Sequence, residues 1–215
     1  MEFNGFSYDR PPVLLIHGAF AGAWMWEGAF LDSMTKAGLS ALAPDRGDAN
    51  KLLSGNSLEA SYQSIIIRAV ERCLVPPILV THSLGALLAQ RLLGRTKISA
   101  LVMLAPVPPE GMLFDTPLLL ATQPALWHGV WNFLNGKRES AFQSMVDIIF
   151  SRQVEGTEIN LHAAKMVFES PGTVFDAHLP VPVMPAFCVG VPVLVIAGAE
   201  DKLISHLASV RTARS

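Results

Sequence analysis

The 215-residue sequence predicts an α/β fold, in which a doubly wound and mostly parallel sheet carries helices on both faces. Two observations lead to this class. Short apolar runs, typical of buried parallel strands, alternate with segments of helical spacing. The alternation stops between residues 106 and 185 and then resumes, which predicts a helical insertion. The expected strands are 13–16, 40–44, 78–80, 99–105 and 192–198, and the expected helices are 24–37, 58–73, 84–93 and 204–214.

The insertion has helical patterns but no convincing strand, and it is rich in aromatic side chains. Its expected helices are 118–134, 140–150 and 158–168. An insertion that follows the carboxyl end of a strand is typical of a lid over an active site. A helical packing subdomain without substrate contact is the alternative. The chain therefore divides into a first part of the sheet domain, the lid and a shorter second part of the sheet domain, at residues 1–105, 106–185 and 186–215.

The motif Thr81-x-Ser83-x-Gly85 lies between an expected strand and an expected helix. A strand that turns into a helix within so few residues forces the central serine into a strained backbone conformation. The serine hydroxyl then stands clear of the sheet, and the helix N-terminus points at it. The pattern predicts that Ser83 is a nucleophile, although Thr81 stands where a glycine is usual. An ordinary serine at a helix N-terminus is the alternative.

Composition excludes several classes of function. Hydrophobic residues make up 51% of the chain and charged residues 16%, and the net charge is −2 without a basic block. These values argue against nucleic-acid binding and against electrostatic membrane anchoring. The N-terminus lacks the order of a signal peptide, and no apolar window reaches the ~18 residues of a transmembrane helix, so a cytoplasmic location is expected. Cys73 and Cys188 lack metal-ligand spacing and are expected to be reduced thiols.

Three motifs in this order resemble the α/β-hydrolase superfamily. His17-Gly18-Ala19, followed by Gly22-Ala23-Trp24, is similar to its oxyanion loop, in particular that of the methylesterase and hydroxynitrile-lyase branch and of lysophospholipase-like bacterial hydrolases. The segment from Thr81 to Gly85 matches the nucleophile elbow, and Ala197-Gly198-Ala199-Glu200-Asp201 matches the strand end that carries the catalytic acid. The resemblance covers nearly the whole chain.

The resemblance implies roles for individual residues. Ser83 is the nucleophile, and Asp201 orients and charge-balances the catalytic histidine, with Glu200 as the neighbour that could take this role instead. The backbone N–H groups of Ala19 and Leu84 form the oxyanion hole. Neither a metal nor an organic cofactor is needed.

The catalytic histidine is not found by this reasoning. In the family it follows the acid, on a loop beyond one further strand. The only histidine after Asp201 is His206, which we expect at the surface. His17 belongs to the oxyanion loop, and the elbow is expected to turn His82 away from Ser83. No motif selects His128, His162 or His178 in the insertion. We therefore expect that the final strand and the histidine loop are missing, that the chain is truncated at its C-terminus, and that its activity is low.

The expected function is that of a serine hydrolase, which cleaves carboxylic esters of hydrophobic, uncharged substrates through an acyl-enzyme on Ser83. A non-catalytic binding module or inactive fragment is the alternative, and a lyase on the same scaffold is a third. The expected substrate pocket is mainly apolar, and its walls should include Phe20 and some of Trp127, Trp131, Phe133 and Phe142. The strand at Val193 is expected to be an exposed edge through which the protein self-associates.

Overall fold

The computed structural model describes residues 10–45, 58–150, 156–167, 177–180 and 190–215. Its centre is a parallel five-stranded sheet in the order β2-β1-β3-β4-β5. The strands are β1 (Val13–Ile16), β2 (Ala41–Leu42), β3 (Ile78–His82), β4 (Ala100–Leu104) and β5 (Val193–Ile196). Each of the five coincides with an apolar run that the sequence marked as a strand, and β3 continues two residues beyond its run, to His82. The predicted α/β class with a doubly wound parallel sheet is therefore confirmed.

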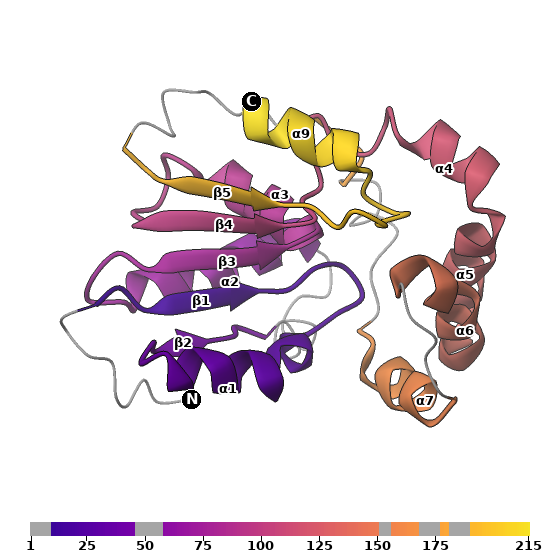
Figure 1. Cartoon of the computed structure of the whole chain (residues 1–215), viewed down its shortest axis with the longest axis horizontal. Coiled ribbons are helices and arrows are strands. Elements are labelled where there is room, and N and C mark those ends of the chain that lie inside the picture. Colours follow the sequence, from indigo (N-terminus) through magenta and orange to yellow (C-terminus); the bar gives the residue numbers. More distant parts are fainter. Residues whose placement is uncertain (1–9, 46–57, 151–155, 168–176, 181–189) are drawn as a thin grey trace.

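Side-chain alternation along the strands gives the sheet two different buried faces. Leu14 and Ile16 of β1 point to the face covered by α2 (Leu58–Glu71) and α3 (Leu84–Leu92). Val13 and Leu15 point to the opposite face, where Trp26 of the short 3₁₀ helix η1 (Ala23–Trp26) and α1 (Ala29–Lys36) cover them. Figure 1 shows this three-layered arrangement, with α2 and α3 behind the sheet and α1 in front. Parallel strands buried on both faces explain why these runs are continuously apolar.

Two of the expected helices are interrupted, each for a backbone reason. The segment expected as one helix over 24–37 is divided into η1 and α1 because Gly28 between them has a φ of 68°. The segment expected over 118–134 is divided into α4 (Thr116–Thr122) and α5 (Pro124–Leu134). A proline disfavours helical geometry in the residue before it, and Gln123 has an extended φ of −129°. The expected loop over 45–56 lies almost wholly outside the described residues.

The remaining helices agree with the sequence to within a few residues. The insertion continues with α6 (Arg138–Ile149) and α7 (Gly156–Lys165), and α9 (His206–Arg214) follows β5. Ser205 caps α9, because its hydroxyl accepts a hydrogen bond from the backbone N–H of Ala208 at 3.1 Å. None of the helices within the described ranges has the length and apolar character needed to cross a bilayer.

The insertion stands beyond the carboxyl ends of the strands, to which the arrowheads in Figure 1 point. It has a core of its own, formed by Leu126, Phe133, Ala141, Phe142, Met145, Val146, Ile148, Ala163 and Met166. Phe20, from the loop after β1, packs against this core, and its ring meets Phe133 edge-on at a centroid distance of 4.8 Å. The backbone N–H of Val167 also donates to the Phe20 carbonyl at 3.1 Å. The insertion is therefore joined to the loop that begins the site.

Candidate active site

Ser83 lies at the junction of β3 and α3 in a strained conformation, with φ 52° and ψ −118°. Its backbone N–H donates to the carbonyl of Leu104 in β4 at 3.1 Å, and its own carbonyl accepts from Val107 at 3.3 Å. These hydrogen bonds stabilise a conformation that non-glycine residues rarely adopt. The elbow geometry expected from the sequence is present.

Gly85 explains how the helix can follow so closely. A side chain at this position would place its Cβ 2.5 Å from the carbonyl oxygen of His17 and 2.9 Å from that of Ile16. Only glycine allows α3 to approach the end of β1 to this extent. The third position of the motif is therefore a packing requirement, which brings Ser83 beside the oxyanion loop.

Thr81 fits where a glycine is usual because its hydroxyl has a partner. Its side chain is fully buried, and Oγ1 donates to the carbonyl of Val102 in β4 at 3.0 Å. A buried hydroxyl with a hydrogen bond avoids the desolvation cost that would otherwise disfavour it. The departure from the usual pattern does not disturb the elbow.

The loop after β1 packs directly against the elbow. A Cβ on Gly18 would lie 3.0 Å from the Cβ of Ser83 and 2.9 Å from Nδ1 of His82. Ala19 follows Gly18 and lines the same cavity as Ser83. Leu84 is the first residue of α3, and the first N–H groups of a helix have no acceptor within the helix. Ala19 therefore lies at the cavity of Ser83 and Leu84 follows Ser83 directly, while their role as oxyanion donors stays a prediction.

The contacts of His17 hold the oxyanion loop in place, which is the structural role that its position in the loop suggested. Its side chain is fully buried and its ring stacks on Tyr62 of α2 at a centroid distance of 4.7 Å. The hydroxyl of Tyr62 donates to the His17 carbonyl at 3.0 Å. These contacts fix the start of the oxyanion loop against α2.

Asp201 follows β5 and has a fixed carboxylate. Its Oδ1 accepts hydrogen bonds from the backbone N–H groups of Leu203 and Ile204, each at 2.8 Å. Asp201 is half-buried, whereas the neighbouring Glu200 is exposed. This difference favours Asp201 over Glu200 as the acid, because a hydrogen-bonded carboxylate has a defined orientation.

Ser83, Asp201 and Ala19 border one cavity of about 1700 Å³. This volume exceeds the ~300–1,000 Å³ of common small-molecule sites. Phe20, Trp127 and Phe142 line the cavity, as the sequence predicted for its walls. Trp131 and Phe133, the two other aromatic residues considered for the walls, do not line it. Trp131 is 68% exposed on α5, and Phe133 is buried behind Phe20 in the core of the insertion.

An aromatic wall formed by Trp24, Phe142, Phe150 and His162 was not predicted from the sequence. The His162 ring lies 5.6 Å from Trp24, 6.0 Å from Phe142 and 6.1 Å from Phe150, between ring centroids. All four residues line the cavity. They come from η1, α6, the end of α6 and α7, so no local pattern could have brought them together.

Three histidines, His82, His162 and His178, line the cavity, while His128 and His206 are exposed. The sequence predicted that the His82 side chain points away from Ser83. In the structure, Nδ1 of His82 and Cβ of Ser83 both lie within about 3 Å of the place that a Cβ on Gly18 would occupy. Burial lowers the pKa of His82, and the negative charge of Asp201 partly opposes this shift. The His82 ring therefore favours its neutral form, which can accept a proton.

Among the described residues, no group of three or more His, Cys, Asp or Glu side chains could hold a metal ion. Cys73 is a half-buried free thiol that donates to the carbonyl of Ala69 at 3.2 Å, and burial raises its pKa. Cys188 lies outside the described residues.

Comparison with known proteins decides the family. The alpha/beta hydrolase family matches residues 13–215, which is nearly the whole chain. This protein belongs to the alpha/beta hydrolase family. A search of curated proteins finds no match to the sequence of this hydrolase.

Solved structures share the fold of this hydrolase at low sequence identity. The Rv0554 protein of Mycobacterium tuberculosis is 19% identical with a TM-score of 0.64, over 95% of this chain and 77% of that chain. A hydrolase from Oleispira antarctica is 17% identical with a TM-score of 0.63, over 97% and 80%. A methylesterase from Arabidopsis is 18% identical with a TM-score of 0.59, over 95% and 85%. The resemblance inferred from the three motifs is confirmed at the level of fold and family.

Proposed function

We propose that this hydrolase cleaves carboxylic esters of hydrophobic, uncharged substrates through an acyl-enzyme on Ser83. The observation that carries the proposal is the strained Ser83 at the end of β3, facing a cavity walled largely by apolar side chains. A strained serine at a strand-to-helix turn is the arrangement that exposes a nucleophile. Apolar walls with few charged groups favour an uncharged substrate.

The proposed reaction uses the groups around Ser83 in turn. A general base takes the hydroxyl proton of Ser83 as Oγ attacks the ester carbonyl carbon, and the backbone N–H groups of Ala19 and Leu84 stabilise the negative charge on the carbonyl oxygen. The carbon–oxygen ester bond then breaks, and the base returns the proton to the departing alcohol. The same base next takes a proton from water, which attacks the acyl-enzyme and releases the carboxylic acid, and the proton returns to Ser83. Asp201 is the proposed acid that orients the base.

The base is the part of the proposal for which no residue is assigned. His82, His162 and His178 border the cavity, and the motifs favour none of them.

The test compares the wild-type chain with Ser83→Ala and Ser144→Ala. Ser144 is a matched control on α6, where its hydroxyl donates to the Ser140 carbonyl at 2.7 Å. Turnover of nitrophenyl butyrate should disappear in Ser83→Ala and persist in Ser144→Ala. Intact mass after reaction with a fluorophosphonate should show one adduct, dependent on Ser83. Equal rates in the wild-type chain and Ser83→Ala would sink the proposal.

A charged substrate tests the second half of the proposal. Nitrophenyl hemisuccinate has an acyl chain of similar length to nitrophenyl butyrate but carries a carboxylate. We expect the butyrate ester to be preferred by at least about tenfold, because burying an unpaired charge against apolar walls is costly. A preference for the hemisuccinate would contradict the proposed substrate class.

A non-catalytic binding module that uses the same cavity is the second candidate. In that case the cavity would bind hydrophobic esters without Ser83-dependent turnover. Titration of ester binding by tryptophan fluorescence distinguishes the two, because Trp24 and Trp127 line the cavity. Binding that is equal in the wild-type chain and Ser83→Ala, with no turnover in either, would support the binding module.

A further inference from the structure

We propose that Arg211 on α9 is a specificity-determining residue, because its two ion pairs hold the start of the insertion and thereby position the wall that α4 contributes to the cavity. The consequence for substrates rests on the proposed esterase function. The consequence for the position of α4 does not.

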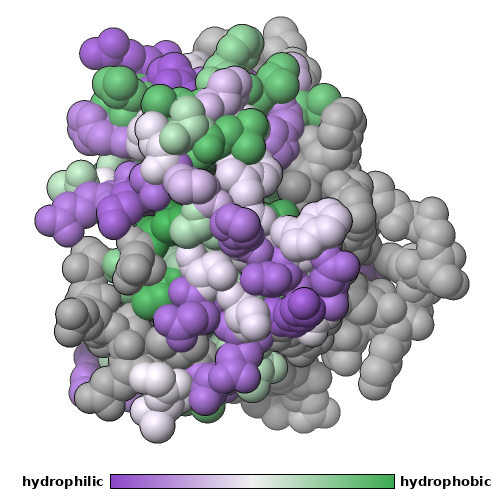
Figure 2. Space-filling view, turned by 90° about the vertical axis from the view of Figure 1, so that its right-hand side faces the viewer, coloured by the Kyte–Doolittle hydropathy of each residue, from purple (hydrophilic) through white to green (hydrophobic). Residues whose placement is uncertain are grey.

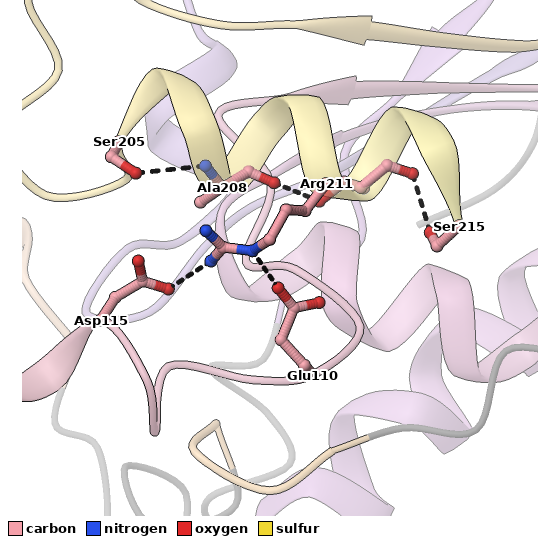
Figure 3. Close-up of polar contacts among 7 residues, drawn as sticks. Glu110, Asp115, Ser205, Ala208, Arg211 and Ser215 are labelled. Atoms are coloured by element: carbon pink, nitrogen blue, oxygen red, sulfur yellow. Dashed lines mark hydrogen bonds and ion pairs between the residues drawn. The ribbon is translucent and has the colours of Figure 1, made fainter.

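Arg211 connects two carboxylates across about a hundred residues of sequence. Its Nη2 donates to Oδ2 of Asp115 at 2.6 Å, and its Nε donates to Oε1 of Glu110. Figure 3 shows the guanidinium of α9 between these two side chains, both of which come from the segment that connects β4 to α4. One arginine thus ties the last helix to the segment from which the insertion begins.

The Asp115 carboxylate pairs with Arg211 and does not cap α4. Asp115 occupies the N-cap position of α4, yet its side chain makes no capping hydrogen bond. Aspartate at this position usually accepts a hydrogen bond from the helix N-terminus. Here the carboxylate turns to Arg211, so the ion pair acts on the residue at which α4 begins.

Packing of α4 depends mainly on Leu119, which is partly buried against two apolar clusters. No residue of α4, all of which the structure describes, is buried. Leu118 and Leu120 are 62% and 50% exposed, and Phe114 just before the helix is 75% exposed. Figure 2 faces the insertion and shows hydrophobic residues in the upper part of the view, interrupted by hydrophilic ones. With so little buried surface, polar contacts at its start contribute much of what fixes α4.

The width of the cavity depends on the position of α4. Thr116 and Leu119 of α4 line the cavity that contains Ser83. A shift of the helix therefore changes the width of the cavity at this wall. Access of a small ester depends little on this width, whereas access of a bulky ester depends on it strongly.

The base of the insertion has anchors of its own, although the Met112 carbonyl also accepts hydrogen bonds from the N–H and the hydroxyl of Thr116 in α4, at 2.9 Å and 2.7 Å. The backbone N–H of Met112 donates to the carbonyl of Ala177 at 3.0 Å, and a Cβ on Gly111 would lie 2.6 Å from the backbone of His178. Met112 is buried together with Ile204 and Ala208 in a cluster that includes Leu84. The two ends of the insertion thus remain together when the ion pairs of Arg211 are removed, and the change should be local to α4.

The ion pairs are half-exposed, with 42% of the Arg211 side chain accessible to solvent. Exposed ion pairs contribute little to global stability and are screened by salt. The expected signature is therefore a change in the local opening of α4 with little change in the melting temperature.

The experiment measures amide hydrogen exchange across residues 113–122 in the wild-type chain, Arg211→Met and Arg214→Met. Arg214 is the matched control, since it is an exposed arginine on the last turn of the same helix. We expect exchange in α4 to be about five-fold faster in Arg211→Met and in the wild-type chain at 1 M salt. Exchange in α3 should not change in either variant. Equal protection of α4 in Arg211→Met and the wild-type chain would overturn the proposal.

The second measurement compares kcat/KM for nitrophenyl acetate and nitrophenyl decanoate. We expect the ratio between the two esters to change about five-fold in Arg211→Met, and to remain unchanged in Arg214→Met. Arg211→Lys should restore part of the wild-type ratio, because lysine can replace one ion pair but not both. Faster exchange in α4 with an unchanged ester ratio would refute the specificity role. Faster exchange with no Ser83-dependent turnover at all would refute the proposed function while leaving the ion pairs as the anchor of α4.

Discussion

Replacement of Gly85 by alanine tests whether close packing of α3 on β1 builds the elbow. The added Cβ would lie 2.5 Å from the His17 carbonyl oxygen and 2.9 Å from that of Ile16. Both atoms belong to the backbone at the end of a central strand, so neither can turn aside as a flexible side chain would. The helix must instead retreat by roughly 0.5–1 Å, which places the change among overpacked cores that cost about 1–3 kcal/mol or more.

The higher helix propensity of alanine offsets part of this cost, because glycine inside a helix is about 1 kcal/mol less favourable than alanine. We expect a net loss of about 1–2 kcal/mol in the free energy of unfolding. For a chain of this size that corresponds to a fall of about 2–8 °C in Tm. Urea unfolding followed by tryptophan fluorescence measures the loss, since Trp26 is 3% exposed in the folded chain.

Gly156→Ala is the matched control for this experiment. Its Cβ would meet no atom within 4 Å at the start of α7. We expect this variant to be as stable as the wild-type chain or slightly more stable. If Gly85→Ala lost less than about 0.5 kcal/mol, the close approach of α3 to β1 would not be the reason for glycine at this position.

Three further outcomes are expected. Thr81→Val should lower the free energy of unfolding by about 1 kcal/mol in urea titrations, because it removes the hydrogen bond to the Val102 carbonyl in the buried sheet. Burial lowers the pKa of His82 in the folded chain, whereas the unfolded chain binds a proton on this residue near pH 6.5. The free energy of unfolding should therefore fall as the pH decreases below about 6.5, and His82→Gln should reduce this fall. If His82→Gln left the pH profile unchanged, the lowered pKa of His82 would not be its cause. Leu194→Lys on β5, where Leu194 is 54% exposed at the sheet edge, should reduce self-association measured by light scattering, whereas Leu74→Lys at a site 76% exposed but outside the sheet should not.

Elements with a local cause were predictable from the sequence. Apolar runs gave all five strands, and the small residues around Ser83 gave the elbow, because a tight strand-to-helix turn restricts its neighbours directly. The break before Pro124 also had a local cause, although the helical spacing on both sides concealed it. Asp201 was preferred over Glu200 through resemblance, and its hydrogen bonds to two backbone N–H groups give that preference a physical reason.

Features that depend on distant parts of the chain were not predictable. Trp127 and Trp131 lie about one helical turn apart, yet Trp127 lines the cavity and Trp131 is exposed. The contact of Arg211 with Glu110 joins residues about a hundred positions apart, and no periodicity encodes it. His82 lies beside Gly18 because the end of β1 approaches the elbow. The side-chain alternation along β3 alone does not predict this approach.

The contact of Phe20 with the insertion has a consequence for synthesis of the protein on the ribosome. Phe20 emerges early, but its partners Phe133 and Val167 follow more than a hundred residues later. At about 5–20 residues per second, the loop after β1 waits for roughly 6–30 s before it can reach these contacts. Throughout this interval the contacts of Phe20 with Phe133 and Val167 cannot form. The nascent chain is therefore most exposed to chaperones, or to wrong partners, at the loop that will later border the nucleophile.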